Sequence, residues 1–154
     1  MSEPKNWLVH GHSDFERSLH ESMAAVEKWD WQQAKDLFHE LSSQIEKHMA
    51  MEDEVLYPAY ESFADLPQEP IRALKDEHEK ITQLVGDVET VLDTNDSEHV
   101  LESMTRFEGI LLDHHEKEES IFLPMAGHFL EPLKETLLER MREFDDSAEE
   151  KGKQ

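Results

Sequence analysis

Apolar residues recur every three or four positions along most of the chain, which is the period of an amphipathic α-helix. This pattern predicts four long helices, each with one apolar face, over about residues 13–28, 30–57, 70–93 and 97–124. A shorter helix is predicted over about residues 132–144, and the polar residues 145–154 are predicted to form a frayed tail. The chain is therefore expected to be all-α.

Residues that favour helix ends stand at the predicted boundaries. Asp30 is suited to cap the second helix, and Asp96 or Ser97 can cap the fourth. Pro70 suits the first turn of the third helix, whereas Pro58 is expected to end or kink the second. Long amphipathic helices with short connections predict an up-down-up-down four-helix bundle over about residues 9–125, in a single domain of residues 1–154.

The composition narrows the chemistry that such a bundle can carry. The chain has no cysteine, which excludes disulfides and thiolate-bound metals and leaves His, Asp and Glu as the metal ligands. Its 37 acidic residues outnumber 15 Lys and Arg residues and give a net charge of −22, so nucleic acid and anionic membranes are not expected as partners. No apolar run could span a membrane and no secretory signal is recognisable, so a cytoplasmic location is expected.

The two halves of the sequence repeat each other at an offset of 66 residues. Four pairs of identical residues are related in this way: His12 and His78, His48 and His114, Glu52 and Glu118, and Pro58 and Pro124. Apolar positions of the predicted helices follow the same offset. An internal two-fold repeat is therefore predicted.

Six of the repeated residues fall on the apolar faces of the predicted helices. They are His12, His48, Glu52, His78, His114 and Glu118. On the second and fourth helices, a histidine and a glutamate four residues apart continue the apolar stripe, so both side chains are expected to point into the core. A bare carboxylate there would cost several kcal/mol. Two divalent cations about 3.5–4 Å apart, bridged by the glutamates, would remove that cost. This ligand set suits iron, manganese or zinc.

Two other helical metal motifs are absent from the sequence. No histidine has a glutamate three residues before it, as the carboxylate bundles of ferritin type require. No His-Glu-x-x-His occurs either, which excludes a metalloprotease helix.

The chain resembles the hemerythrin-like family, also described as the HHE cation-binding domain, over roughly residues 9–125. The motifs that carry the resemblance are HMAME at 48–52 followed by LYP at 56–58, EHE at 77–79, and HHEKE at 114–118 followed by FLP at 122–124. The resemblance implies a non-haem centre of two iron ions (Fe2+/Fe3+) in a four-helix bundle, with both glutamates bridging and an oxo or hydroxo bridge. Members bind dioxygen, sense oxygen or redox state, or handle nitric oxide and iron.

The sequence differs from two branches of that family. Oxygen carriers have a fifth histidine on the third helix, but the residues four before and four after His78 are Leu74 and Thr82. Oxygen carriers also have an aspartate five residues after the last histidine, where this chain has Glu119. The iron–sulfur repair branch usually has a cysteine-containing segment ahead of the bundle, and this chain has no cysteine.

Several other residues are alternatives or neighbours of the predicted ligands. His10 could replace His12, and the carboxylates of Glu116 and Glu119 are alternates that fit a solvated face better. His115 lies about 100° round the helix from His114, which makes it a weaker candidate. Tyr57 either hydrogen-bonds near the centre or packs with its hydroxyl at the rim, and packing is favoured. Surface or locally bonded positions are expected for His20, His39, His99 and His128.

Three kinds of function share this predicted centre. The first is binding or sensing of O2 or NO. The second is an enzyme that reduces NO or peroxide with electrons from a donor protein. The third is iron handling without turnover. A bundle with a metal-free network of buried His and Glu side chains is the remaining alternative.

Overall fold

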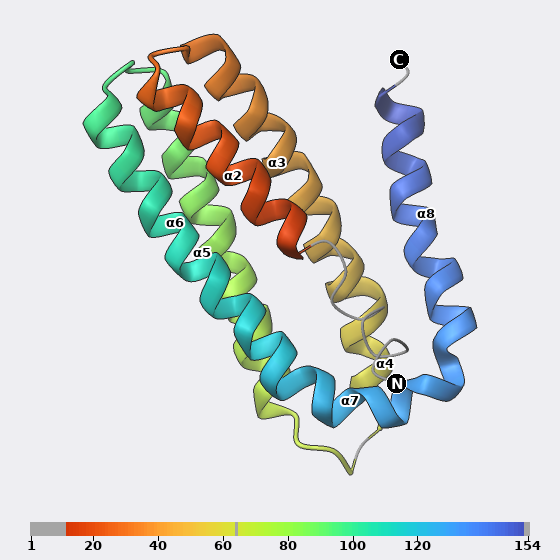
Figure 1. The fold of residues 1–154 in the computed structure, drawn as a ribbon. Helices are drawn as coiled ribbons and strands as arrows, with labels where there is room; N and C mark the ends of the chain where they lie inside the picture. Colours follow the sequence, from red (N-terminus) through yellow and green to blue (C-terminus); the bar gives the residue numbers. More distant parts are fainter. Residues whose placement is uncertain (1–11, 64, 153–154) are drawn as a thin grey trace.

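The computed structural model describes the backbone of residues 12–63 and 65–152 and the side chains of residues 14–63 and 65–144. Four long helices form the body of the molecule: α2 (His12–Glu27), α3 (Trp31–Met51), α5 (Glu69–Leu92) and α6 (Ser97–Lys117). Successive helices run in opposite directions, and α2 packs on α3, α3 on α5, α5 on α6 and α6 on α2 (Figure 1). The predicted all-α, up-down-up-down bundle is confirmed.

The ends of these helices follow the predicted caps. The Asp30 side chain accepts the backbone N–H of Gln33 at 3.2 Å, and Asp96, rather than Ser97, accepts that of His99 at 3.3 Å. The residue before each cap has a positive φ: Trp29 (61°) ends the turn after α2, and Asn95 (55°) ends the turn after α5. These turn residues also lie 66 positions apart, although the two-fold repeat as a whole stays a prediction.

The helical chain continues past Pro58, which was expected to end or kink the second helix, and past Pro124, where the fourth predicted helix ended. Helix α3 passes into the π-helical η1 (Glu52–Leu56) and then α4 (Tyr57–Glu61). Helix α6 passes likewise into the π-helical η2 (Glu118–Phe122) and then α7 (Leu123–Leu130). Each proline falls in the first turn of the α-helical piece that follows the π turn.

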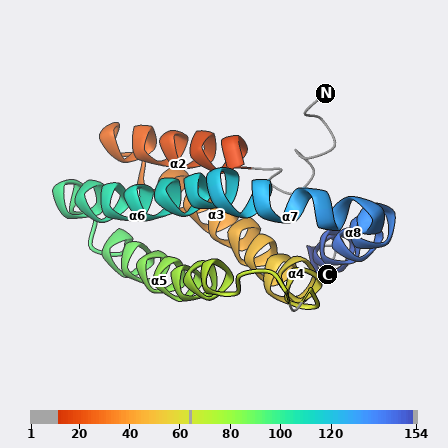
Figure 2. The same ribbon diagram turned by 90° about the horizontal axis from the view of Figure 1, so that it is seen from below.

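The C-terminal part of the chain packs against the end of the bundle. A short 3₁₀ turn, η3 (Glu131–Leu133), leads into α8 (Lys134–Gly152). This helix is longer than the predicted one and covers much of the predicted tail, whose Ala, Glu and Lys residues are good helix formers. Helix α8 contacts α3 and η1, and Figure 1 and Figure 2 show it at the side of the molecule where α4 and α7 lie. The Arg140 guanidinium donates a hydrogen bond to the backbone carbonyl of Glu54 at 3.4 Å. This carbonyl lies four residues before Pro58, which has no N–H to donate to it.

The apolar core has two parts. We call the first the bundle cluster: it fills the space between α2, α3, α5 and α6 and includes Phe15, Phe38, Leu41, Ile45, Ile81, Val88, Met104, Phe107 and Leu111. We call the second the end cluster: it includes Met51, Leu56, Tyr57, Tyr60, Ile71, Leu74, Phe122, Leu130, Leu137 and Met141. Each large side chain buried in this way contributes about 1.5–3 kcal/mol. Among the described residues, no helix combines the length and hydrophobicity needed to cross a membrane.

Candidate metal centre

Five buried polar side chains lie where the bundle cluster gives way to the end cluster, and we call them the polar layer. They are His48, Glu52, His78, His114 and Glu118, with exposed fractions of 9, 0, 5, 2 and 0 %. The structure thus brings together five of the six predicted ligands. The sixth, His12, begins α2, and its side chain lies outside the described residues, as does the alternative His10.

The two glutamates of the polar layer occupy equivalent places in their helices. Glu52 is the first residue of η1 and Glu118 is the first residue of η2. In each case the backbone N–H five residues later, of Tyr57 or Leu123, donates to the glutamate's own carbonyl. A π turn takes one more residue than an α turn, so it changes the angle at which the following side chains leave the helix. Such turns are frequent at functional sites.

The side chains of the polar layer form two groups that could each hold a cation. The first group is Glu52, His78 and His114, and the second is His48, Glu52 and Glu118; within each group the ligand atoms lie within 4.8 Å of one another. Glu52 belongs to both groups. Its Oε1 is 3.0 Å from His78 Nε2, and its Oε2 is 3.4 Å from His48 Nε2. One carboxylate therefore faces histidines from two sides.

Glu118 joins the two groups from the other side. One oxygen, Oε1, lies 3.4 Å from Nε2 of His114, which belongs to the first group. The other oxygen, Oε2, accepts the Tyr57 hydroxyl at 3.2 Å. Tyr57 is fully buried and its ring stacks on that of His78, with centroids 5.5 Å apart. The favoured expectation of a hydroxyl at the rim is wrong, because Tyr57 reaches into the polar layer.

The two imidazoles of the first group are each oriented by a carboxylate. His78 Nδ1 lies 2.9 Å from Asp53 Oδ1, and His114 Nδ1 lies 2.8 Å from Glu77 Oε1. Because each Nδ1–H donates to a carboxylate, the Nε2 atom is left facing the centre, as for histidines that bind metals. Sequence reasoning missed these roles of Asp53 and Glu77, although each directly neighbours a predicted ligand.

The electrostatics of the two glutamates differ strongly. Burial alone would raise the pKa of Glu52, but the charge of His48, together with hydrogen bonds from neighbouring side chains, lowers this pKa well below its usual value. Burial and the negative charge of Glu52 raise the pKa of Glu118 well above its usual value. Without a cation, the layer therefore favours the ionised form of Glu52 and disfavours that of Glu118.

The histidines of the first group also differ from each other. Burial opposes the charged form of His78, but hydrogen bonds to Asp53 and Glu52 outweigh it and raise the pKa of His78 to about 9. Burial lowers the pKa of His114. In the metal-free protein, His78 therefore carries a proton that a metal ion would have to replace.

The polar layer fits a metal pair because its atoms are suitable ligands and some of them form no hydrogen bond. Glu52 Oε2 and His114 Nε2 are buried, and neither forms a hydrogen bond with the described part of the chain. A buried polar atom that forms no hydrogen bond costs about 1–3 kcal/mol. Imidazole nitrogens and carboxylate oxygens are ligands that iron, manganese and zinc accept.

The weaker candidate ligands lie apart from the two groups. His115 is buried beside Phe15, with ring centroids 6.1 Å apart, and belongs to neither group. Glu116 and Glu119 are exposed, as expected for a solvated face. His20 and His99 are exposed; His20 pairs with Glu108 of α6, and His99 is bonded locally to Asp96. For His20 and His99, the prediction is confirmed.

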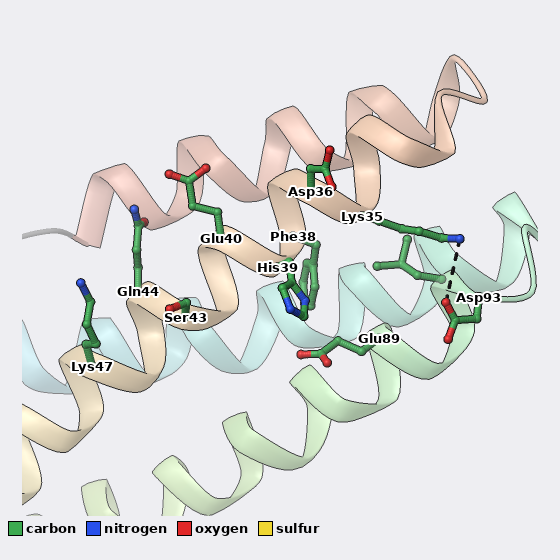
Figure 3. A pocket seen from close by; sticks show the side chains of 11 residues that line it. Lys35, Asp36, Phe38, His39, Glu40, Ser43, Gln44, Lys47, Glu89 and Asp93 are labelled. Carbon is green, nitrogen blue, oxygen red and sulfur yellow. Dashed lines mark ion pairs between the residues drawn. The ribbon is translucent and has the colours of Figure 1, made fainter. Parts of the chain in front are cut away.

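Two surface grooves reach side chains of the polar layer. One lies between α2, α3 and α8 and is lined by Phe15, His48, Met51, Met141 and Phe144, among others. The other lies between α3 and α5 and is lined by Asp53, His78, Glu79 and Thr82, among others. A third groove, shown in Figure 3, lies farther along α3 and α5 beside the Lys35–Asp93 pair and includes none of the predicted ligands.

Comparison with known families agrees with this geometry. The sequence model of the hemerythrin HHE cation-binding domain matches residues 4–126. The chain belongs to this family. The match takes in the four bundle helices and the whole polar layer, and it ends within α7, so that α8 lies beyond it. The searches of curated proteins and of solved structures gave no match. The chain is thus a hemerythrin-like, cation-binding helical bundle.

Proposed function

We propose that the polar layer holds two iron ions and that the protein binds a diatomic ligand, O2 or NO, there. The observation that carries this proposal is that Glu52 belongs to both ligand groups, as a carboxylate shared by two cations would. Glu52, His78 and His114 would hold one ion. His48, Glu52 and Glu118 would hold the other, with His12 as its remaining predicted ligand.

Iron in this position would supply an open coordination site and the electrons that binding of a diatomic ligand requires. The residues around it have their own tasks. Asp53 and Glu77 keep the Nε2 atoms of His78 and His114 facing the centre. The Tyr57 hydroxyl donates to Glu118 and fixes that carboxylate. The apolar clusters on both sides keep bulk water away from the layer.

Iron handling is a second candidate, and one feature favours it. The groove between α3 and α5 that reaches His78 is lined by the acidic side chains of Glu46, Asp53 and Glu79. A negative opening attracts cations and would assist their entry or release. An enzyme that reduces NO or peroxide would use the same centre with electrons from a donor protein.

The deciding experiment combines metal analysis with optical spectra. The purified protein is assayed for metal per chain, and spectra are recorded as isolated, after anaerobic reduction, and after exposure to O2 or NO. Two irons per chain and a new spectrum that reverses when the gas is removed would support ligand binding. Two irons that only oxidise would favour the enzyme or iron handling. A chain without metal would contradict the proposal and leave a metal-free polar network.

A further inference from the structure

A chain of charged contacts leads from the surface of the bundle to the polar layer on one side. The Glu77 carboxylate is 8 % exposed and has a partner at each oxygen. Oε1 accepts a hydrogen bond from His114 Nδ1–H at 2.8 Å, and Oε2 accepts one from the Lys117 ammonium. Lys117 Nζ also lies 3.2 Å from Asp113 Oδ2, and its side chain is 40 % exposed. Lys117, Glu77 and His114 are thus connected in series.

Each contact in this series changes the strength of the next. A carboxylate that accepts an imidazole Nδ1–H makes the opposite nitrogen, Nε2, a stronger donor to a metal ion. A cation bound to the other oxygen of that carboxylate draws charge away and weakens the effect. Glu77 therefore strengthens His114 as a ligand, and Lys117 moderates Glu77.

The charged residues of this series are not repeated at the offset of 66 residues. The residues 66 positions before Glu77 and Lys117 are Gly11 and Met51, neither of which can carry the same charge. Asp53, which orients His78, is more open to solvent than Glu77, with a side chain 41 % exposed against 11 %. The two cation positions are therefore supported differently.

We propose that Glu77 is a positioning residue for His114, and that Lys117, acting through Glu77, sets how strongly His114 donates to the metal ion at the first position. The proposal rests on the metal pair put forward above. It makes the two positions unequal in affinity, and it gives the exposed Lys117 control over the oxidation state that the first ion favours.

The test uses three variants and one matched control. Glu77→Gln keeps an oxygen that can accept from His114 but removes the charge, and Glu77→Ala removes both. Lys117→Gln removes the cation. The control is Lys35→Gln, which deletes the same charge from a lysine whose side chain is 37 % exposed and which pairs with Asp93 far from the polar layer (Figure 3). Binding of Co2+ is measured by competition with a chelator, alongside the midpoint potential of the iron-loaded protein and the thermal unfolding of the metal-free protein.

Opposite effects are expected from the two ends of the series. Glu77→Gln should weaken one of the two binding steps about 10–100-fold and shift the midpoint potential to more positive values, because the ferric ion loses more from a weaker donor. Lys117→Gln should strengthen the same step about two- to fivefold and shift the potential to more negative values. Lys35→Gln should change neither, and a merely structural role would alter unfolding without opposite potential shifts.

The outcomes separate this proposal from the one on which it rests. The proposal on Glu77 and Lys117 would be overturned if Glu77→Gln bound Co2+ as tightly as the wild type. It would also be overturned if the midpoint potential of Lys117→Gln equalled that of Lys35→Gln or shifted in the same direction as that of Glu77→Gln. In either case the wild-type protein would still hold two metal ions. A wild-type protein that binds no Co2+ and no iron would overturn both. If Glu77→Ala does not fold, the glutamine variants still decide.

Discussion

The bundle cluster and the polar layer lie on the same helix faces, one turn apart, yet different interactions stabilise them. On α3, Ile45 of the cluster precedes His48 of the layer, and on α6, Leu111 precedes His114. The apolar side chains are satisfied by packing on one another. The layer has buried atoms that packing does not satisfy, such as Glu52 Oε2. We therefore expect the stability of the cluster to be independent of metal and that of the layer to depend on it.

Glu52→Gln is expected to have the largest effect on this contrast, because Glu52 is shared by both ligand groups. At a free metal concentration a thousand times the dissociation constant, one bound ion stabilises a protein by about 4 kcal/mol. The variant should lose both ions and with them at least that much metal-dependent stability. Chemical denaturation with metal and with a chelator, together with metal content, measures this. Glu54→Gln, an exposed carboxylate two residues away, is the control; if Glu52→Gln still held two ions, the shared ligand would be wrong.

Phe107→Ala tests the other side of the comparison. Phe107 is fully buried in the bundle cluster and packs on Phe38, with ring centroids 5.8 Å apart. Its truncation should lower the free energy of unfolding by about 3–5 kcal/mol, by the same amount with and without metal. The metal content of the folded protein should stay at the wild-type value. A marked fall in metal content would show that the cluster and the layer are not separable.

The pH dependence of metal binding should show which groups lose protons to the ion. His78, with its pKa raised to about 9, is protonated in the metal-free protein at neutral pH, and burial together with the negative charge of Glu52 raises the pKa of Glu118. Since the folded pKa of His78 lies above its unfolded value, its protonated form stabilises the metal-free protein at low pH, and this stabilisation is lost as the pH rises through about 9.

A bound ion replaces these protons, so the affinity for a divalent cation should rise with pH, about tenfold per unit for each proton released, or about 1.4 kcal/mol. Calorimetry in buffers of different ionisation enthalpy counts the protons. Asp53→Asn removes the hydrogen-bonded charge that raises the pKa of His78, so the rise in affinity should level off at lower pH in this variant. An affinity that is flat from pH 6 to 9 would contradict the assignment of His78 as a ligand.

The sequence was sufficient for the features that depend on helical period. A stripe every three or four residues fixes which side of a helix is buried, so the bundle and the burial of His48, Glu52, His78, His114 and Glu118 could be predicted together. The hydrogen-bond partners of the imidazole Nδ1 atoms could not be predicted in this way. Asp53 and Glu77 lie beside the stripe, and each meets a histidine of another helix, which depends on how the helices are aligned.

The π turns also could not be predicted from the spacing of apolar residues. An α turn and a π turn differ by one residue, which a short apolar pattern does not resolve. As a result, Pro58 was predicted to end or kink a helix, whereas the α-helix changes to a π segment before it and resumes with the proline in its first turn, as also happens at Pro124. The length of α8 was underestimated for another reason, since the apolar pattern stops before the helix does.

Tyr57→Phe should have the smallest effect and is the most specific probe of the layer. Its hydroxyl donates to Glu118, whose charged form is disfavoured by burial and by Glu52 in the metal-free protein and would be favoured beside a cation. A hydrogen bond to a charged group contributes about 1 kcal/mol more than one to a neutral group, so the variant should bind metal about fivefold more weakly. Tyr60→Phe is the matched control, because Tyr60 is equally buried but donates to the Pro67 carbonyl at 2.7 Å. Both variants should unfold somewhat more easily without metal. Only Tyr57→Phe should lose metal affinity, and an equal loss in Tyr60→Phe would mean that the end cluster as a whole, rather than this hydroxyl, supports the layer.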